Sequence, residues 1–187
     1  TLAMSVYGDL DISVIDELPA GRKPIKTVHR YDTNRLKVIG FIRDEISKGR
    51  QIYIVYPLIN ESETLDFKDL IDGYEGIVRD FPMPNYQVSM VHGQMKPADK
   101  EFEMQRFVKG ETHIMVATTV IEVGVNVPNA SVMIIESAER FGLSQLHQLR
   151  GRVGRGSEQS YCILMTSHKL GENSKTRMQT MVQSSDG

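Results

Sequence analysis

The feature that most constrains this chain is a repeated switch between two apolar periods, which begins near Ile25. Short apolar runs alternate with longer segments in which apolar residues recur every three or four positions. The pattern predicts strands at 25–30, 51–56, 87–92, 113–117, 131–135 and 160–165. It predicts helices at 33–48, 63–81, 97–108, from about 144 onward, and at 172–182.

This alternation indicates an α/β fold. Nearly continuous apolar strands between helices are typical of a mainly parallel sheet that helices cover on both faces. Ligands of open α/β sheets bind beyond the carboxyl ends of the strands. We therefore expect the functional side chains of this chain to gather at such ends.

Local signals place the ends of the first helix. Thr33 is a candidate N-cap, and Gly49 is suited to close the helix. Residues at helical spacing predict one buried face, formed by Leu36, Ile39, Gly40, Ile42 or Arg43, and Ile46.

Three segments follow from this organisation. Residues 1–24 contain a strand-like piece around 13–15 and end in a segment rich in proline and glycine, which predicts a linker. Residues 25–166 form the main domain. Residues 167–187 begin a further helical segment, and we expect the apolar Met178, Met181 and Val182 to pack against something outside the main domain.

Composition limits the classes of function. Hydrophobic residues make up 40% and charged residues 25% of the 187 residues, as in globular proteins. The net charge of -2 gives no overall positive field, so any contact with a nucleic acid must be local. The single cysteine, Cys162, lies in an apolar run and is interpreted as a core residue of a protein in a reducing cytoplasm. The sequence has no apolar run long enough for a membrane span.

The most informative segment is Gln148–Gly156, in which three arginines and three glycines share nine residues. Guanidinium groups bind phosphate oxygens with two bonds, and glycines allow the backbone to come close to a ligand. The glycines follow the order G-x-x-G-x-G, which does not match the dinucleotide-binding pattern. The segment therefore favours a polyphosphate site, with a solvated basic loop as the simpler alternative.

Two further segments follow predicted strands. Thr118 and Thr119 lie at the end of a strand, where their hydroxyls and the nearby amides could hold a phosphate of DNA. His92 and Gly93 precede a helix that begins at Pro97, and the first amides of a helix attract phosphate. The simpler alternatives are an ordinary turn after a strand and a surface histidine.

Taken in order, these segments resemble motifs of the superfamily 2 DNA helicases. Residues 116–130 are similar to motif V, and residues 148–156 are similar to motif VI. Residues 1–19 and 142–150 resemble the RecG family of branched-DNA translocases. The resemblance implies a RecA-like C-terminal helicase domain, with residues 1–24 as the tail of a first motor domain and its linker.

The resemblance also implies roles for individual residues. The catalytic residues would be Arg152, Arg155 and Gln148. The nucleotide would contact Glu122, Gly124 and Asn126, although the family commonly has an acidic residue where this chain has Asn126. DNA would contact His92, Gly93, Thr118 and Thr119. We expect no metal ligand within this chain.

The chain has no phosphate-binding loop of the form G-x-x-x-x-G-K-[ST]. The resemblance implies that ATP and Mg²⁺ bind with the help of the first motor domain, and that this chain alone is inactive. The expected partners are branched or forked DNA and the upstream motor domain of the same chain. The expected setting is a monomer in the bacterial cytoplasm, associated with the nucleoid. Two alternatives stay open, the motor domain of a transcription-repair coupling factor and a non-catalytic α/β module that binds a nucleotide or a protein.

Overall fold

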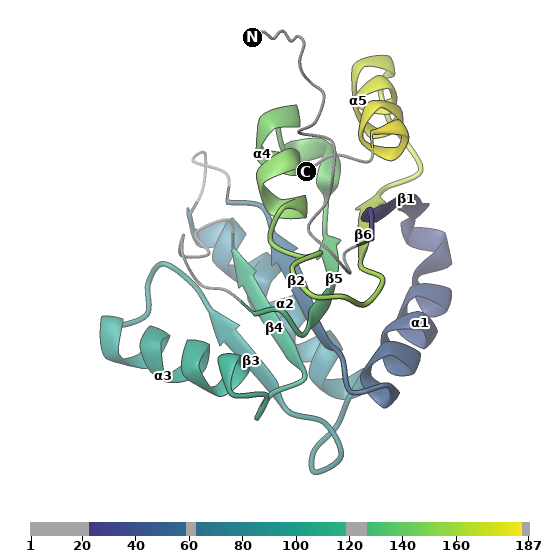
Figure 1. The fold of residues 1–187 in the computed structure, drawn as a ribbon. Coiled ribbons are helices and arrows are strands. Elements are labelled where there is room, and N and C mark those ends of the chain that lie inside the picture. Colours follow the sequence, from purple (N-terminus) through teal and green to yellow (C-terminus); the bar gives the residue numbers. More distant parts are fainter. Residues whose placement is uncertain (1–22, 59–62, 119–126, 185–187) are drawn as a thin grey trace, which may run out of the picture.

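The fold is a single parallel sheet with helices on both faces (Figure 1). The computed structural model describes residues 23–58, 63–118 and 127–184. Its six strands lie in the order β1-β6-β5-β2-β4-β3, and every pair of neighbours is parallel. The strands are β1 (Lys26–Tyr31), β2 (Gln51–Tyr56), β3 (Val88–Val91), β4 (Ile114–Thr118), β5 (Ala130–Ile135) and β6 (Tyr161–Thr166). The predicted fold class is confirmed.

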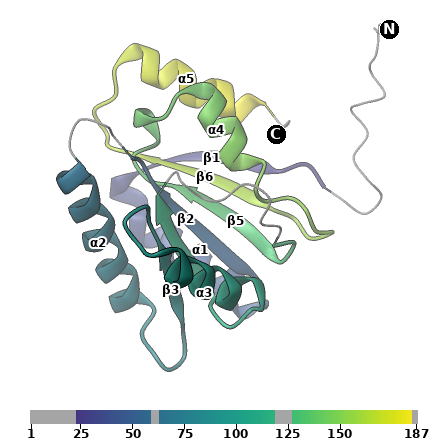
Figure 2. The ribbon, with the colours of Figure 1, turned by 90° about the vertical axis from the view of Figure 1, so that its left-hand side faces the viewer.

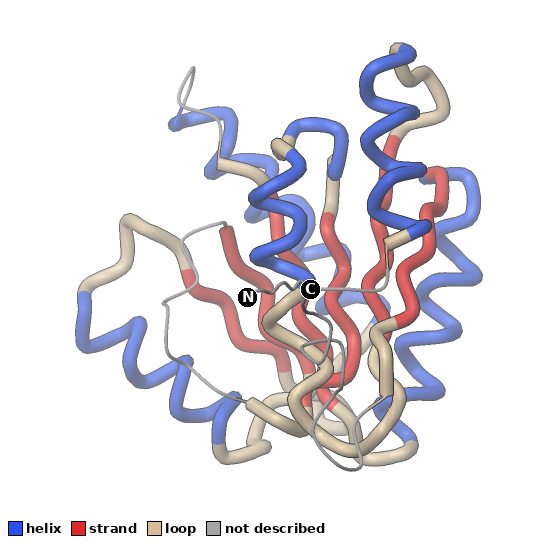
Figure 3. The backbone as a smooth tube through the Cα atoms, turned by 45° about the horizontal axis from the view of Figure 1, so that its top comes forward, coloured by secondary structure: helices blue, strands red, loops and turns tan. Residues whose placement is uncertain are grey.

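The helices divide between the two faces of the sheet, as Figures 2 and 3 show. One buried cluster joins the sheet to α1 (Arg35–Ser47) and α2 (Glu63–Asp80). The second cluster joins it to α3 (Pro97–Val108), α4 (Leu143–Arg150) and α5 (Glu172–Gln183). Each fully buried aliphatic side chain in these clusters contributes about 1.5–3 kcal/mol through removal of its surface from water. Cys162 is fully buried, as expected, and burial raises the pKa of its thiol to about 12.

The first helix differs from its prediction at the amino end. Thr33 is not its N-cap, because it lies inside a short 3-10 helix, η3 (Asp32–Asn34), that precedes α1. Leu36 is not buried but 86% exposed, because the inner face of α1 is formed by Val38, Ile39, Ile42 and Ile46. The carboxyl end matches the prediction, since Gly49 follows the helix with a φ of 86°.

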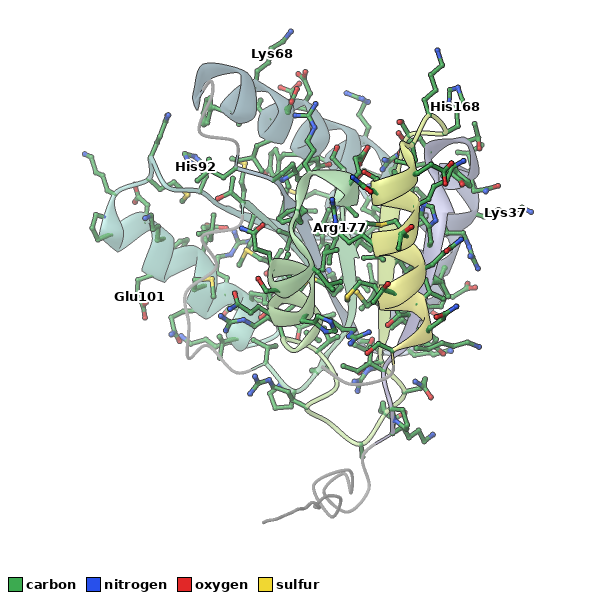
Figure 4. The ribbon with its side chains drawn as sticks, turned by 90° about the horizontal axis from the view of Figure 1, so that it is seen from above. Lys37, Lys68, His92, Glu101, His168 and Arg177 are labelled. Carbon is green, nitrogen blue, oxygen red and sulfur yellow. The ribbon has the colours of Figure 1, made fainter. Side chains whose placement is uncertain are left out.

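The last helix packs on this domain, which corrects the expectation that its apolar residues face something outside. Met178 and Met181 are buried in the same cluster as residues of α4. Arg177 of α5 donates hydrogen bonds to the backbone oxygens of Glu139 and Phe141, next to the short helix η4 (Ala138–Arg140) (Figure 4). Val182 is 40% exposed. The α5 helix therefore covers the sheet near β1.

Candidate nucleotide and nucleic-acid site

The arginine-rich segment leaves the end of α4 and returns to the start of β6. Residues 151–156, which we call the arginine loop, begin with turn hydrogen bonds from Arg152 to Leu149 and from Val153 to Arg150. The side chain of Val153 is buried in the core, which anchors the middle of the loop. The loop therefore has a fixed course along the domain.

Two glycines allow the arginine loop to pack closely. Gly154 has a φ of 81°, and a Cβ there would lie 2.7 Å from the side chain of Ile25. The amide of Gly154 donates to Oγ of Ser160 at 3.1 Å. A Cβ at Gly156 would lie 2.8 Å from the carbonyl oxygen of Pro128. The close approach that these glycines permit is thus to other parts of the protein.

The arginines of the segment lie in different surroundings. Arg150 is fully buried, and its guanidinium donates to the backbone oxygens of Met181 and Ser184 at 3.0 and 2.7 Å. It also donates to Oγ1 of Thr27 at 3.1 Å, so Arg150 joins α4, α5 and β1. This structural role was not predicted from the sequence.

Arg152, Arg155 and Gln148 all reach the surface, as a contact with a nucleotide requires. Arg155 and Gln148 are exposed and Arg152 is partly exposed. Nε of Arg155 donates to the backbone oxygen of Gly151 at 3.2 Å, within the arginine loop. The two predicted catalytic arginines are therefore not buried as structural supports, in contrast to Arg150.

The surroundings of Tyr53 in β2 indicate where the arginine loop lies relative to the sheet. Its side chain is buried among the residues of the cluster under α3 and α4. Burial raises the pKa of Tyr53 to about 12, and the positive charges of Arg152 and Arg155 act in the opposite direction. Both arginines therefore lie within electrostatic range of the phenol of this central strand.

Three of the four residues expected to contact DNA come together at the carboxyl ends of β3 and β4. These strands pair in parallel with Val91 opposite Ala117, so the next residues, His92 and Thr118, lie side by side. Gly93 is exposed, and a Cβ there would contact nothing within 4 Å. Thr118 is only 5% exposed. The ends of these two strands thus bring three predicted residues to one edge of the sheet.

His92 is oriented by its neighbours. Its ring meets the ring of Phe67 edge to face at 5.0 Å, and its Nδ1 accepts a hydrogen bond from the amide of Gln94 at 3.2 Å. Burial lowers the pKa of His92, and Lys100 lowers it further. The neutral ring is favoured, and with Nδ1 as an acceptor its proton lies on Nε2. Nε2 can then donate to a phosphate oxygen.

Four of the predicted site residues, Thr119, Glu122, Gly124 and Asn126, lie outside the described residues. The positions on either side of them are described. Thr118 ends β4 beside His92, and Pro128 contacts Gly156 of the arginine loop. The intervening segment therefore connects, along the chain, the two groups of predicted site residues.

An ion pair next to the carboxyl end of β5 was not predicted from the sequence. The two terminal nitrogens of the Arg35 guanidinium each donate to one carboxylate oxygen of Glu136 at 2.7 Å, and Glu136 is 5% exposed. The bond to Glu136 raises the pKa of Arg35. The next residue, Ser137, has the left-handed φ of 48°, which is uncommon for serine. A single acidic residue directly after a strongly apolar strand was the sequence signal for this site.

The described residues contain neither a cluster of metal ligands nor a helix that could span a membrane. No group of three or more His, Cys, Asp or Glu side chains there could hold a metal ion. No helix in the same part of the chain is long and apolar enough to cross a membrane.

Comparison with known proteins identifies the domain type. Residues 34–157 match the family model of the helicase conserved C-terminal domain. The whole chain is 51% identical to the ATP-dependent DNA helicase RecG of Synechocystis and 48% identical to that of Bacillus subtilis. It covers 22% and 27% of those proteins, so it spans about a quarter of the length of the curated relatives it matches.

Solved structures agree with this assignment. A structure of RecG bound to a three-way DNA junction superimposes with a TM-score of 0.76 at 42% identity, over 99% of this chain and 24% of that chain. The yeast DEAD-box splicing factor Prp28 superimposes with a TM-score of 0.65 at 20% identity, over 88% of this chain and 34% of that one. The second likeness concerns the fold alone.

Proposed function

This chain belongs to the helicase conserved C-terminal domain family, and we propose that it is the second motor domain of an ATP-dependent DNA helicase that acts on branched DNA. The RecG helicases of several bacteria are about half identical to it along its whole length. One of the solved relatives is bound to a three-way DNA junction. These relatives favour this function over the motor domain of a transcription-repair coupling factor.

The observation that carries the proposal is the separation of the arginines. In a loop that packs closely at Gly154 and Gly156, Arg155 is exposed and Arg152 is partly exposed, whereas the neighbouring Arg150 is buried. A surface guanidinium on a fixed backbone is suited to reach a triphosphate bound by another domain. In this proposal both arginines stabilise the negative charge that develops on the γ-phosphate of the substrate ATP. Gln148, exposed on α4, helps to orient the attacking water.

The remaining nucleotide contacts are proposed for Glu122, Gly124 and Asn126. In the sequence they lie between Thr118, at the end of β4, and Pro128, which contacts Gly156 of the arginine loop. The amide of Asn126 can donate or accept a hydrogen bond with the ribose but supplies no charge. Mg²⁺ would be held by acidic side chains of the first motor domain.

DNA is proposed to run along the carboxyl ends of β3 and β4. In this proposal His92 donates from Nε2 to a phosphate, and Gly93, Thr118 and Thr119 make further contacts with the DNA backbone. Contacts to phosphates suit a motor that steps along any base sequence. Closure of two motor domains on ATP, and their release after hydrolysis, would move these contacts along the strand.

The wider setting follows from the same relatives. We propose that the protein works as a monomer in the bacterial cytoplasm at the nucleoid, in DNA repair and recombination. The name of these bacterial relatives, ATP-dependent DNA helicase RecG, supports an action on DNA in bacteria.

Replacement of the arginines tests the proposal. In the intact protein, Arg152→Ala and Arg155→Ala should each lower ATP turnover by ~10³ to 10⁵, because an arginine that meets developing charge in a cleft contributes this much. The matched control is Arg79→Ala, which removes an exposed arginine from α2. Circular dichroism and DNA binding should be unchanged in all three variants.

Steady-state turnover measured with saturating forked DNA decides the outcome. Arg152→Lys and Arg155→Lys keep the charge but lose the planar, two-bond geometry, so they should rescue turnover only weakly. If both alanine variants turn over ATP at the normal rate, the proposed role of the arginine loop is wrong. Nucleotide binding without any turnover in the unaltered intact protein would instead indicate a non-catalytic module.

A further inference from the structure

A recess of about 300 Å³ lies on the face of the sheet opposite the arginine loop, between the edge strand β1 and helix α1. The recess is separate from the predicted DNA contacts at the ends of β3 and β4. Figure 4 shows His92, one of those contacts, and Lys37, which lines the recess, on opposite sides of the molecule. The lining residues come from β1, α1 and β6. They are Lys26, Val28, Arg30, Lys37, Val38, Phe41, Tyr161 and Ile163.

The alternation of β1 explains why these residues meet. Successive side chains of a strand point to opposite faces, so Lys26, Val28 and Arg30 face α1. Thr27 and His29 face the other way, where Thr27 accepts from Arg150 and His29 bonds to Thr166. One face of β1 is thus used for internal structure, and the other lines the recess.

The floor of the recess is apolar and partly open. The rings of Phe41 and Tyr161 meet edge to face at 4.9 Å, with Val28 beside them. These three residues are only partly buried against the cluster below. An aliphatic or aromatic side chain placed on this floor would remove apolar surface from water on both partners.

The rim is positively charged. Lys26, Arg30 and Lys37 line it, and no acidic residue does. None of these three cations forms an ion pair within the part of the chain that the structure describes. The whole chain carries a net charge of -2, so the positive charge of this rim is local, and it attracts acidic groups.

The backbone of β1 offers a further set of contacts. In the described sheet β1 is an edge strand that pairs only with β6. Its outer edge presents amide donors and carbonyl acceptors with which a peptide strand can pair. One of these acceptors, the carbonyl of His29, takes a hydrogen bond from the guanidinium of Arg30 at 2.9 Å, and a paired strand would replace that bond. A DNA backbone has phosphate acceptors but no amide donors for the carbonyls of this edge.

We propose that this recess is a docking site for an acidic, extended segment of a partner protein. The segment adds a strand to the outer edge of β1, places apolar side chains on Val28, Phe41 and Tyr161, and pairs its carboxylates with Lys26, Arg30 and Lys37. This site is independent of the arginine loop and of the proposed ATP chemistry.

Fluorescence anisotropy with a labelled peptide tests the site in the intact protein. The probe is Glu-Glu-Val-Thr-Ile-Thr-Val-Glu-Glu, whose apolar side chains share one face of a strand. Binding should weaken as ionic strength rises from about 0.05 M to about 0.3 M. The double variant Arg30→Glu, Lys37→Glu should bind about tenfold more weakly, because two attractive charges become repulsive. Lys68→Glu, an exposed charge change on α2, is the matched control and should bind normally.

A second peptide separates strand pairing from simple charge attraction. N-methylation of the three central residues removes the amide donors and should weaken binding by about tenfold. The double variant should keep its DNA-stimulated ATP turnover, since neither residue belongs to the arginine loop or to the predicted DNA contacts at the ends of β3 and β4. Equal binding of the peptide to the double variant and to the unaltered protein would overturn the proposal, as would equal binding of the methylated peptide. Loss of affinity for a DNA duplex but not for the peptide would assign the recess to nucleic acid instead.

Discussion

At the scale of single residues, the arginines of one short segment have different tasks. Arg150 and Arg155 are five positions apart, yet the first is fully buried and the second is exposed. The buried guanidinium donates to the backbone oxygens of Met181 in α5 and of Ser184 directly after it. A buried polar group that loses its hydrogen-bond partner costs much free energy of folding. Arg150 is therefore expected to determine stability, and Arg155 to determine chemistry.

Urea unfolding should separate these tasks. Arg150→Ala should lower the free energy of unfolding by on the order of 3 kcal/mol, because it leaves the carbonyls of Met181 and Ser184 without their donor and opens a cavity. Arg155→Ala should change it by less than about 0.5 kcal/mol, as for most surface positions. If Arg150→Ala unfolds at the same urea concentration as the unaltered chain, the anchoring role of Arg150 is wrong.

The resemblance to a family singled out Arg152 and Arg155 as the catalytic pair, and this assignment stays a prediction. Chemistry alone grouped all three, because each guanidinium can bind phosphate. A signal for the difference was present in α4, where Leu146, Leu149 and Arg150 share the buried helical face. The hydrogen-bond partners of Arg150 lie far away along the chain, and no local pattern reveals them.

At the scale of elements, the sequence placed the strands and helices well but made no prediction of the order of the strands in the sheet. The strand 51–56 and the helix 97–108 were predicted with the observed ends, because continuous apolar runs and a proline at the first helical position are strong local signals. The order β1-β6-β5-β2-β4-β3 was not predicted. That order depends on which helix covers which face, and this is set by packing between distant segments.

The fixed course of the arginine loop leads to a test at this scale. Gly154→Ala and Gly156→Ala should each lower the free energy of unfolding by about 1–3 kcal/mol, since one needs a positive φ and the other would contact a backbone oxygen. They should also lower ATP turnover in the intact protein through displacement of the arginines. Thermal unfolding and turnover are measured on the same samples.

Gly93→Ala is the control for these variants. Its Cβ would contact nothing within 4 Å, so the melting temperature should stay unchanged. If Gly154→Ala and Gly156→Ala melt at the same temperature as Gly93→Ala, the arginine loop is not held by close packing at its glycines.

At the scale of the whole molecule, we propose that this domain supplies one side of a catalytic cleft. The carboxyl edge offers His92 and Gly93, and the arginine loop offers two surface guanidinium groups. The sequence has no phosphate-binding loop, and the net charge of -2 gives no general attraction for DNA. Each proposed contact is therefore local and weak by itself. High affinity for ATP and DNA must come from a second domain that closes on the same ligands.

The isolated 187-residue chain should accordingly neither hydrolyse ATP nor bind DNA tightly. We expect no DNA-stimulated release of phosphate from ATP, because the groups that hold the β-phosphate and Mg²⁺ are not in its sequence. DNA binding should be no tighter than ~10⁻⁴ to 10⁻⁶ M and should fall steeply with salt, as for contacts made only to phosphates. His92→Ala should weaken even this binding, whereas Glu101→Ala, a change at an exposed position on α3, should not. A tight complex that is insensitive to salt would show that this domain reads more of the DNA than its backbone.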